Sequence, residues 1–388
     1  MGVISAVGNN LAQNRNSLAE GRCGISRHLD LFPSKYAGEL PFGSIHVSNA
    51  ELQSQLNAFE PGVTRTSLLA LHAFNEAVAD SGLSTDQLAE TGTALIGAST
   101  VGGMCLTDEL YHDANTQEPG SPYLSSYDNA SVTLYLQKRF AVGGIVNTIN
   151  TACSSSANSI MYGAGLIKLG LAKRAIVGGA DSLAKFTING FNALHILSRE
   201  FCRPFDEKRS GLNLGEGAAF LVLEKEEDAA GKNIYAVLSG YANTNDAYHP
   251  SSLSDEGDGP FLSMKGALEM AALEPAAISY INAHGTGTEN NDLVESVAML
   301  RLFENVPAFA STKSYTGHTL GAAGAIEAVY SILNIQRQEI YASLQFADPV
   351  PGPALQPVLQ YRQEQVTHVM SNSFGFGGNC SSLIFSKA

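Results

Sequence analysis

One cysteine of this chain stands where a nucleophile would be expected. In NTINTACSSSANSI an apolar strand, predicted over residues 145–150, runs into Cys153, and a small-residue helix, predicted over 154–169, begins directly after it. A thiol at such a turn lies at the positive end of the helix dipole among free backbone N–H groups, and both favour the reactive thiolate. Most cysteines, however, are inert and many are small core residues. The position alone therefore supports the two interpretations equally.

A histidine follows another predicted strand, residues 278–283, in the segment INAHGTGTENNDLVES. Ligands of α/β proteins usually bind at the C-terminal ends of parallel strands, and the glycines at 285 and 287 permit close approach of the backbone. His284 is therefore a candidate functional residue. A loop histidine bonded to its neighbours is the alternative, and this motif does not decide between them.

Three ionisable residues accompany a helix rich in Gly and Ala in STKSYTGHTLGAAGAIEAV. Lys313 and His318 precede the helix, and Glu327 lies nine residues beyond His318. Burial of these groups beside such a helix is unfavourable unless they bond one another. The pattern therefore indicates a buried polar network, with a surface lysine and a capping histidine as the alternative.

The C-terminal segment SNSFGFGGNCSS places three glycines around Phe374 and Phe376. Glycine weakens a strand, so its repetition here indicates a special backbone shape. Such a loop can present N–H groups to an oxyanion or move an aromatic side chain as a gate. A simple glycine-rich turn is the competing interpretation.

In this order and at this spacing, the four motifs resemble the β-ketoacyl synthases of the thiolase superfamily, specifically the elongating Cys-His-His type. The resemblance covers nearly the whole chain and includes GVISAVGN, VGGADSL and CRPFDEKRSGLNLGEGAAFLVLE. It implies a 3-oxoacyl-[acyl carrier protein] synthase, which joins an acyl thioester to malonyl-[acyl carrier protein] by decarboxylative Claisen condensation. The pathway would be fatty-acid synthesis or specialised polyketide or polyene synthesis, without a metal or organic cofactor.

The resemblance also assigns roles to individual residues. Cys153 is implied as the acylated nucleophile, and its backbone N–H with that of Phe376 would form the oxyanion hole. His284 and His318 would hold the malonyl thioester and promote decarboxylation, while Lys313 orients the histidine site. The other implied roles are support of this network by Glu327, a structural acidic residue at Asp292, a gate at Phe374 and Phe376, and a candidate monovalent-cation site near Asn282, Glu327, Ser371 and Asn372.

The elements that must position these motifs alternate between short strands and longer helices. Alternation of this kind predicts parallel sheets covered by helices on both faces. With the resemblance, it predicts a thiolase-like α/β fold of five layers, α/β/α/β/α, whose duplicated halves are residues 1–228, carrying the cysteine, and 229–388, carrying both histidines. Besides those above, the predicted elements are strands at 93–97, 175–179, 218–224 and 234–240, helices at 67–79, 261–273, 292–303 and 322–336, and a closing hairpin of 366–371 with 382–385.

The composition excludes several classes of protein. A net charge of −14 over 388 residues argues against nucleic acid as a partner. No apolar run reaches the roughly 18 residues of a membrane-spanning helix, and five scattered cysteines favour a reducing cytoplasm over a disulfide framework. The opening residues lack the organisation of a signal peptide, and GVIS reads as the end of a strand that begins upstream.

The resemblance implies an acyl carrier protein as partner, with acyl and malonyl thioesters as substrates. Because the chain is acidic, docking of an acidic carrier requires local positive charges. A homodimer is expected, paired across an edge strand near Val177 and with residues 129–140 bordering the partner's acyl pocket, while a heterodimer with a chain-length subunit remains open. The expected docking residues are Arg65, Arg203, Lys208 and Arg209.

Three rival functions each meet an obstacle in the sequence. A thiolase needs a second catalytic cysteine in a C-terminal motif, and Cys380 stands in a different context. A starter-unit synthase has Asn in place of His318, and a non-enzymatic chain-length subunit lacks the nucleophile found here as Cys153. The chain does depart from the family pattern in a shorter segment at 198–205 and in Asn379 where Thr is expected, so chain length, pathway and carrier stay open.

Overall fold

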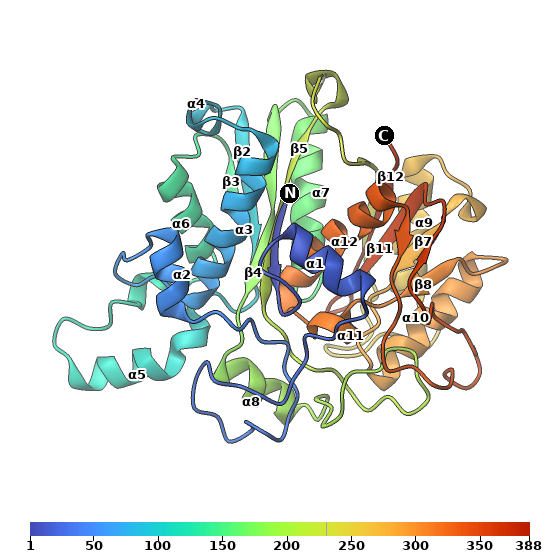
Figure 1. Cartoon of the computed structure of the whole chain (residues 1–388), viewed down its shortest axis with the longest axis horizontal. Helices are drawn as coiled ribbons and strands as arrows, with labels where there is room; N and C mark the ends of the chain where they lie inside the picture. Colours follow the sequence, from blue (N-terminus) through green and yellow to red (C-terminus); the bar gives the residue numbers. More distant parts are fainter. Residues whose placement is uncertain (230) are drawn as a thin grey trace.

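Two five-stranded sheets organise the computed structural model, which describes residues 1–229 and 231–388 (Figure 1). The first sheet contains β1 (Gly2–Ser5), β2 (Thr93–Ala98), β3 (Val146–Ile149), β4 (Arg174–Asp181) and β5 (Gly217–Glu224). The second contains β6 (Val237–Asn245), β7 (Tyr280–Asn282), β8 (Ala308–Ala310), β11 (His368–Phe374) and β12 (Asn379–Ser386). A separate small ladder pairs β9 (Glu339–Ile340) with β10 (Arg362–Gln363).

The two sheets have the same topology, which confirms the predicted duplication at the level of strand order. The first runs β3-β2-β4-β5-β1 and the second β8-β7-β11-β12-β6, so each reads third, second, fourth, fifth, first. Both sheets are mixed. The alternation of strands and helices had predicted sheets that are parallel throughout, and that prediction is wrong. In each, the fifth strand pairs antiparallel with both neighbours, because it returns alongside the fourth without a crossover; β11 and β12 form the predicted hairpin.

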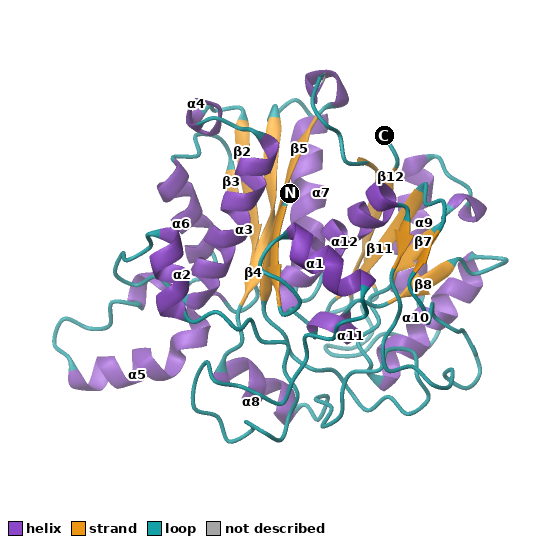
Figure 2. Ribbon diagram, in the orientation of Figure 1, coloured by secondary structure: helices purple, strands orange, loops and turns teal. Residues whose placement is uncertain are grey.

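Helices cover and separate the sheets in the predicted five layers (Figure 2). On the outer side of the first sheet, α3 (Arg65–Ser81) contacts β1, β4 and β5, and α6 (Ser131–Phe140) contacts β2 and β3. Between the sheets, α7 (Ser155–Lys168) contacts β2 and β4, and α12 (Ala323–Arg337) contacts β5 and β11. The outer layer beyond the second sheet holds α9 (Asp258–Ala271) and α10 (Glu289–Leu302).

Small residues allow the two central helices to pack closely. A Cβ at Gly324 of α12 would lie 2.7 Å from the backbone nitrogen of Ala157 in α7. A Cβ at Gly163 would lie 2.3 Å from the side chain of Val177 in β4. Bulkier residues would force the central layer apart, and that layer carries both the nucleophile and Glu327.

Most of the remaining helices are peripheral, but the short helix that carries Lys313 is fully buried. On the outer side of the first sheet, α3 begins at Thr64, whose side chain accepts from the Ser67 N–H, and ends where Gly82 adopts a left-handed conformation at φ 67°. The others are α1 (Leu11–Ala19), α2 (Asn49–Leu56), α4 (Thr85–Ala89), α5 (Thr107–Thr116), α8 (Lys185–Ala193) and α11 (Lys313–Thr316). Among the described residues, no helix is long and apolar enough to cross a membrane.

Val177 does not lie at a sheet edge, so that sequence prediction is wrong. It belongs to β4, which pairs with β2 on one side and β5 on the other, and its side chain is fully buried. The edge of the first sheet beside β2 is instead β3, whose residues are half-buried or exposed. Alternating hydropathy identifies a strand but does not give its place in the sheet order.

Candidate active site

Cys153 lies in a tight turn between β3 and the start of α7. Ala152, directly before it, adopts a left-handed backbone conformation with φ 53°, which a residue with a Cβ rarely adopts outside constrained sites. The Ser155 hydroxyl closes the turn by accepting from the Thr151 N–H at 2.9 Å and donating to the Ala152 carbonyl at 2.5 Å. The thiol is therefore held at the N-terminal end of α7, as predicted.

The resting state of this thiol differs from the prediction. Burial raises the pKa of Cys153 to about 11, while Lys313 and the backbone N–H groups of Phe376 and Cys153 itself act in the opposite direction. Desolvation of the anion therefore outweighs the favourable dipoles. The sulfur rests as a neutral thiol and requires a base before it can attack.

His318 supplies a base at hydrogen-bonding distance. Its Nε2 lies 3.0 Å from Sγ of Cys153. Burial, followed by the charge of Lys313, holds the pKa of His318 well below 6.5, so the ring is neutral and can take the thiol proton. Across residues 1–229 and 231–388, Nδ1 of His318 has no hydrogen-bond partner. No contact at Nδ1 therefore fixes which ring nitrogen carries the proton.

His284 belongs to a buried network with Lys313 and Glu327. The Lys313 ammonium contacts Nδ1 of His284 at 3.3 Å, donates to its carbonyl at 2.7 Å and forms an ion pair with Glu327. An ammonium can only donate, so Nδ1 accepts and the proton of the neutral ring resides on Nε2. Burial and the nearby Lys313 lower the pKa of His284 well below 6.5, and burial raises the pKa of Glu327 to about 7. The predicted polar network is therefore present.

The two histidines and the cysteine converge on one point. The rings of His284 and His318 lie 5.5 Å apart and nearly perpendicular. One nitrogen from each ring and the Cys153 sulfur all lie within 4.8 Å of one another. The arrangement can deprotonate a nucleophile on one side and donate a hydrogen bond to a substrate oxygen on the other.

Two carboxylates of α10 hold the loop that carries His284. Asp292 accepts from the backbone N–H of Phe205 at 2.7 Å and of Gly287 at 3.1 Å, which fits the predicted structural role. Glu295 accepts from the N–H groups of His284 and Gly285, both at 2.9 Å. Sequence reasoning missed Glu295, although its i, i+3 spacing from Asp292 places both on the same helix face. Burial raises the pKa of Glu295 to about 7.

The glycine-rich loop between β11 and β12 approaches the nucleophile directly. A Cβ at Gly375 would lie 2.6 Å from the Thr151 carbonyl, so the loop requires glycine there to come this close. Phe374 is buried against His284, with ring centroids 5.7 Å apart, and the half-buried Phe376 stacks on Phe191 of α8 at 6.0 Å. The loop can therefore serve both roles predicted for it.

Asn379 anchors the base of this loop to the turn that carries the cysteine. Its side-chain oxygen accepts from Ser154 at 2.7 Å and from Asn158 and Asn243, both at 2.8 Å. Ser154 and Asn158 also donate to the Thr151 side chain. Asn379, which stands where Thr was expected, therefore links the glycine-rich loop to α7 and β6 through its side-chain oxygen.

Comparison with known proteins decides the family. The sequence profile of the family "Beta-ketoacyl synthase, N-terminal domain" matches residues 1–229, and that of "Beta-ketoacyl synthase, C-terminal domain" matches residues 235–347. The chain belongs to the β-ketoacyl synthase family.

Several known members of the family match this chain along its whole length. A putative mitochondrial 3-oxoacyl-[acyl-carrier-protein] synthase of Schizosaccharomyces pombe and 3-oxoacyl-[acyl-carrier-protein] synthase 2 of Staphylococcus aureus are each 32% identical, over 100% of this chain and 97% of theirs. A ketosynthase from Xenorhabdus doucetiae, solved in complex with its chain length factor, is 32% identical with a TM-score of 0.84, over 100% of this chain and 96% of that one. The thiolase-like fold is thereby confirmed.

The oxygen atoms at the candidate cation site fit a hard cation. Among the described residues, Asn282 Oδ1, Ser371 Oγ and Glu327 Oε2 are buried without a hydrogen-bond partner, and oxygen donors of this kind suit alkali and alkaline-earth ions. Asn372 is already engaged, donating to Glu295 and accepting from Ser382. Asn282, Ser371 and Glu327 would hold the ion, which would supply positive charge beside the Lys313 pair.

A pocket of about 410 Å³ opens onto Cys153 and both histidines. Arg209 donates to the backbone carbonyls of Thr288 and Glu289 at its rim. Nearby, Arg203 pairs with Asp206 while keeping 30% of its side chain exposed, and Lys208 is exposed. Three of the four expected docking residues thus lie on one segment adjoining the pocket.

Arg65 does not belong with them, and its assignment to docking is corrected. Its side chain is 8% exposed, and its guanidinium donates to both carboxylate oxygens of the fully buried Glu216 at 2.7 and 2.8 Å. Further donations go to the carbonyls of Ile45 and Val47. With its donors occupied inside the protein, Arg65 joins α3 to the start of β5 and offers no surface charge.

Proposed function

We propose that this chain is a 3-oxoacyl-[acyl carrier protein] synthase, which loads an acyl group onto Cys153 and extends it by condensation with malonyl-[acyl carrier protein]. The observation that carries the proposal is the 3.0 Å contact between the Cys153 sulfur and His318 Nε2, beside a His284 whose Nε2 carries a proton. One residue can act as nucleophile, a second as base and a third as hydrogen-bond donor.

In the loading step, His318 Nε2 takes the thiol proton as the Cys153 sulfur attacks the acyl thioester carbonyl. We assign the resulting oxyanion to the N–H groups of Cys153 and Phe376, which both act to lower the pKa of the Cys153 thiol. When the tetrahedral intermediate collapses, the carrier thiolate leaves and recovers the proton from His318. Cys153 then bears the acyl group, and His318 is neutral again.

In the condensation step, the malonyl thioester carbonyl binds against the Nε2–H of His284. As the carboxylate leaves as carbon dioxide, its bonding electrons form an enolate, whose oxygen accepts a stronger hydrogen bond than the thioester carbonyl oxygen did. One such donor contributes about 3–4 kcal/mol. Once the sulfur is acylated, His318 can shift its proton to Nε2 and act as a second donor, because no described residue holds its Nδ1.

The enolate carbon then attacks the acyl carbonyl on Cys153. The C–S bond breaks, the sulfur leaves as thiolate, and the 3-oxoacyl chain remains on the carrier that delivered malonate. The thiolate takes up one proton from solvent, because the proton it lost during loading left with the first carrier. Each turnover therefore consumes one acyl and one malonyl thioester and releases one carbon dioxide and one free carrier.

We infer an acyl carrier protein as partner and a dimer as the working form. The ketosynthase of Xenorhabdus doucetiae was solved with a chain length factor, so a heterodimer stands beside the homodimer as an alternative. In either, β3 offers the accessible edge of the first sheet. We divide the chain into halves at residues 1–228 and 229–388. We also place the enzyme in the cytoplasm; the relatives from S. aureus favour this location, although the S. pombe relative is named mitochondrial.

The proposal is tested by incubating the protein with an acyl-carrier and malonyl-carrier and measuring carrier masses. We expect a 3-oxoacyl-carrier two carbons longer than the starting acyl group, and none with Cys153→Ala. Cys202→Ala, which alters another buried cysteine, is the matched control and should retain product formation. Equal product formation by Cys153→Ala would overturn the proposal.

A further inference from the structure

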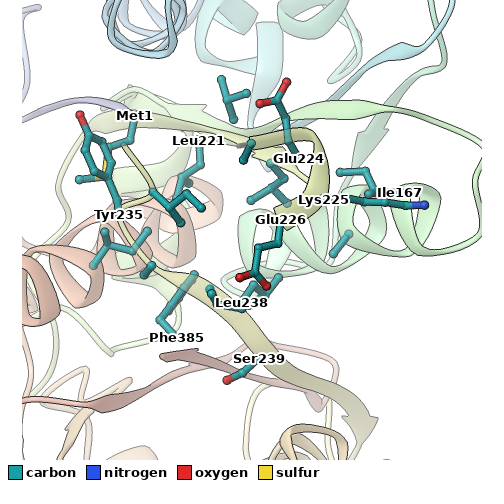
Figure 3. Close-up of a pocket in the computed structure, with 18 of the residues that line it drawn as sticks. Met1, Ile167, Leu221, Glu224, Lys225, Glu226, Tyr235, Leu238, Ser239 and Phe385 are labelled. Carbon is teal, nitrogen blue, oxygen red and sulfur yellow. The ribbon is translucent and has the colours of Figure 1, made fainter. Parts of the chain in front are cut away.

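Two cavities lie at opposite ends of α7. The larger, of about 640 Å³, is lined by Ile167 from the last turn of that helix, and Figure 3 shows Ile167 there with Lys225 and Phe385. The smaller, of about 410 Å³, is lined by Cys153, which lies just before the first turn. Among the residues that the structure describes, none assigned to the proposed reaction lines the larger cavity. Further contributions to that reaction must therefore come from groups bonded to the amino end of α7.

The glycine-rich loop carries one of the two N–H groups assigned to the oxyanion, that of Phe376. The loop is closed on itself by two backbone hydrogen bonds, from the Gly375 N–H to the Asn379 carbonyl at 2.8 Å and from the Gly378 N–H to the Gly375 carbonyl at 3.1 Å. A Cβ at Gly375 would lie 3.2 Å from the backbone nitrogen of Cys153, so this turn lies directly against the nucleophile. Because the turn is closed at Asn379, the place of the Phe376 N–H depends on where Asn379 is held.

The side chain of Asn379 holds the turn that carries Cys153 from both sides. Its Oδ1 accepts from the Ser154 hydroxyl at 2.7 Å, on the carboxyl side of the nucleophile. The same oxygen accepts from Nδ2 of Asn158 at 2.8 Å. The second N–H of that amide donates to Oγ1 of Thr151 at 2.7 Å, on the amino side. One oxygen atom therefore joins both flanks of Cys153 to the loop.

We propose that Asn379 is a positioning residue of the oxyanion hole, which holds the N–H groups of Cys153 and Phe376 at a fixed separation; this role rests on the proposed function. A single residue makes the link, because its side-chain oxygen reaches the nucleophile turn and its backbone carbonyl closes the loop. The hydroxyl of a threonine ends one atom nearer the backbone and could not meet the same donors unless β12 moved. Oxyanion donors act only at about 2.7–3.1 Å from the forming oxygen, so even a small displacement slows the reaction.

This role divides the steps of the reaction into two groups. Acyl loading and condensation both form an oxyanion on the acyl carbon bonded to the Cys153 sulfur, so both depend on the oxyanion hole. Decarboxylation of the malonyl thioester instead forms its enolate against His284 and His318, and neither histidine bonds to Asn379 in the part of the chain that the structure describes. Loss of the Asn379 side chain should therefore slow loading and condensation but spare decarboxylation. A general loss of folded protein would lower all three alike.

The test compares the parent with Asn379→Ala, with Asn158→Ala, which breaks the link to the amino side of the nucleophile from α7, and with the double variant. Acyl loading onto Cys153 is followed by intact mass. Decarboxylation is followed by carbon dioxide release from malonyl-carrier in the absence of acyl-carrier. The matched control is Ser386→Ala, which removes side-chain hydrogen bonds from the opposite end of β12, about 24 Å away at 3.4 Å per residue.

We expect Asn379→Ala to slow loading by about 10–100-fold and Asn158→Ala to slow it by less, with decarboxylation within a few-fold of the parent in both. The double variant should be no slower than Asn379→Ala, because both changes break one link. Ser386→Ala should leave both rates within a few-fold of the parent.

Parental loading by Asn379→Ala, or equal slowing of loading and decarboxylation, would overturn the proposal. If Asn379→Ala does not fold, the same two outcomes for Asn158→Ala decide. A parent chain that loads no acyl group onto Cys153 would contradict the proposed function itself, and the role of Asn379 with it.

Discussion

The sulfur of Cys153 lies 3.0 Å from Nε2 of His318, and burial moves the pKa values of the two groups in opposite directions. The thiol pKa rises to about 11 and the imidazole pKa falls well below 6.5. Both shifts favour a neutral thiol–imidazole pair over a thiolate–imidazolium pair. The sulfur therefore becomes nucleophilic only as its proton moves to His318.

Alkylation of Cys153 by iodoacetamide should accordingly rise steeply with pH. Because only the thiolate reacts, the rate should increase about tenfold per pH unit between pH 7 and 10, below a pKa of about 11. Mass spectrometry of the Cys153 peptide at each pH gives the profile. A rate that is already constant from pH 7 to 8 would indicate a preformed thiolate and contradict this account of the pair.

The two histidines should separate the half-reactions. His318→Ala should slow acyl loading by about 10²–10⁴-fold, because it removes the base. His284→Ala should retain loading within a few-fold but slow decarboxylation of the malonyl thioester by about 10²–10³-fold, because it removes an enolate donor. Acyl-enzyme mass follows the first step and carbon dioxide release the second.

His195→Ala is the matched control for both variants, since His195 lines the same pocket but is exposed and contacts neither the sulfur nor the other histidines. It should leave both rates within a few-fold of the parent. If His284→Ala loses loading as severely as His318→Ala, the roles are wrongly divided.

Protonated Glu295 should stabilise the folded protein at low pH, and this stabilisation should decline as pH rises. Its folded-state pKa is raised from 4.5 to about 7 by burial, so between these values the folded protein retains a proton that the unfolded chain has released. The stabilisation is complete below about pH 4.5 and is lost as pH rises through about 7. Glu295→Gln stays neutral, so the Tm of the parent relative to this variant should fall from pH 5 to pH 8.

Glu269→Gln, at an exposed position of α9, provides the control and should differ from the parent by the same small amount at every pH. A parent-minus-Glu295→Gln difference that is flat or increases with pH would show that the carboxylate, and not the acid, is favoured in the fold.

Arg65 and the segment beginning at Arg203 should behave in opposite ways. Arg65→Ala leaves Glu216 charged and buried without its partner, so it should destabilise the fold by about 3–5 kcal/mol. The paired change Arg203→Gln with Lys208→Glu places no second anion beside Asp206 and should lower Tm far less than Arg65→Ala does, because Arg203 is 30% exposed and Lys208 is exposed. It should nevertheless raise KM for carrier-bound substrates and weaken its dependence on salt. Small soluble acyl thioesters should react as before. An equal loss with both kinds of substrate would remove these residues from the docking surface.

Much of the fold could be predicted from local pattern. The helix predicted over 154–169 is found as Ser155–Lys168, and the hairpin of β11 with β12 was expected from its two apolar runs and glycine-rich turn. These features depend on residues close together in the chain. The position of Val177 at the centre of its sheet depends on which strands pair, which periodicity does not encode.

The sequence predicts the site residues that lie in short motifs. It does not predict the contacts that a side chain makes with residues far away in the chain. Cys153, His284 and His318 meet as expected. The charge of Arg65 appeared available for docking because its partner Glu216 lies 151 residues away and no short pattern links them. The neutral state of Cys153 was missed for a related reason: the sequence shows the helix dipole beside the thiol but not the burial that outweighs it.

The central claim is that Cys153 carries the growing chain, and mapping of the acylated residue tests it most directly. The protein is incubated with an acyl-carrier in the absence of malonyl-carrier, digested at low pH to preserve the thioester, and its cysteine peptides are weighed. The account predicts one acyl group per chain, on the peptide containing Cys153, and none on Cys153→Ala. An acyl group on Cys23, Cys105, Cys202 or Cys380, or full acylation of Cys153→Ala, would contradict it.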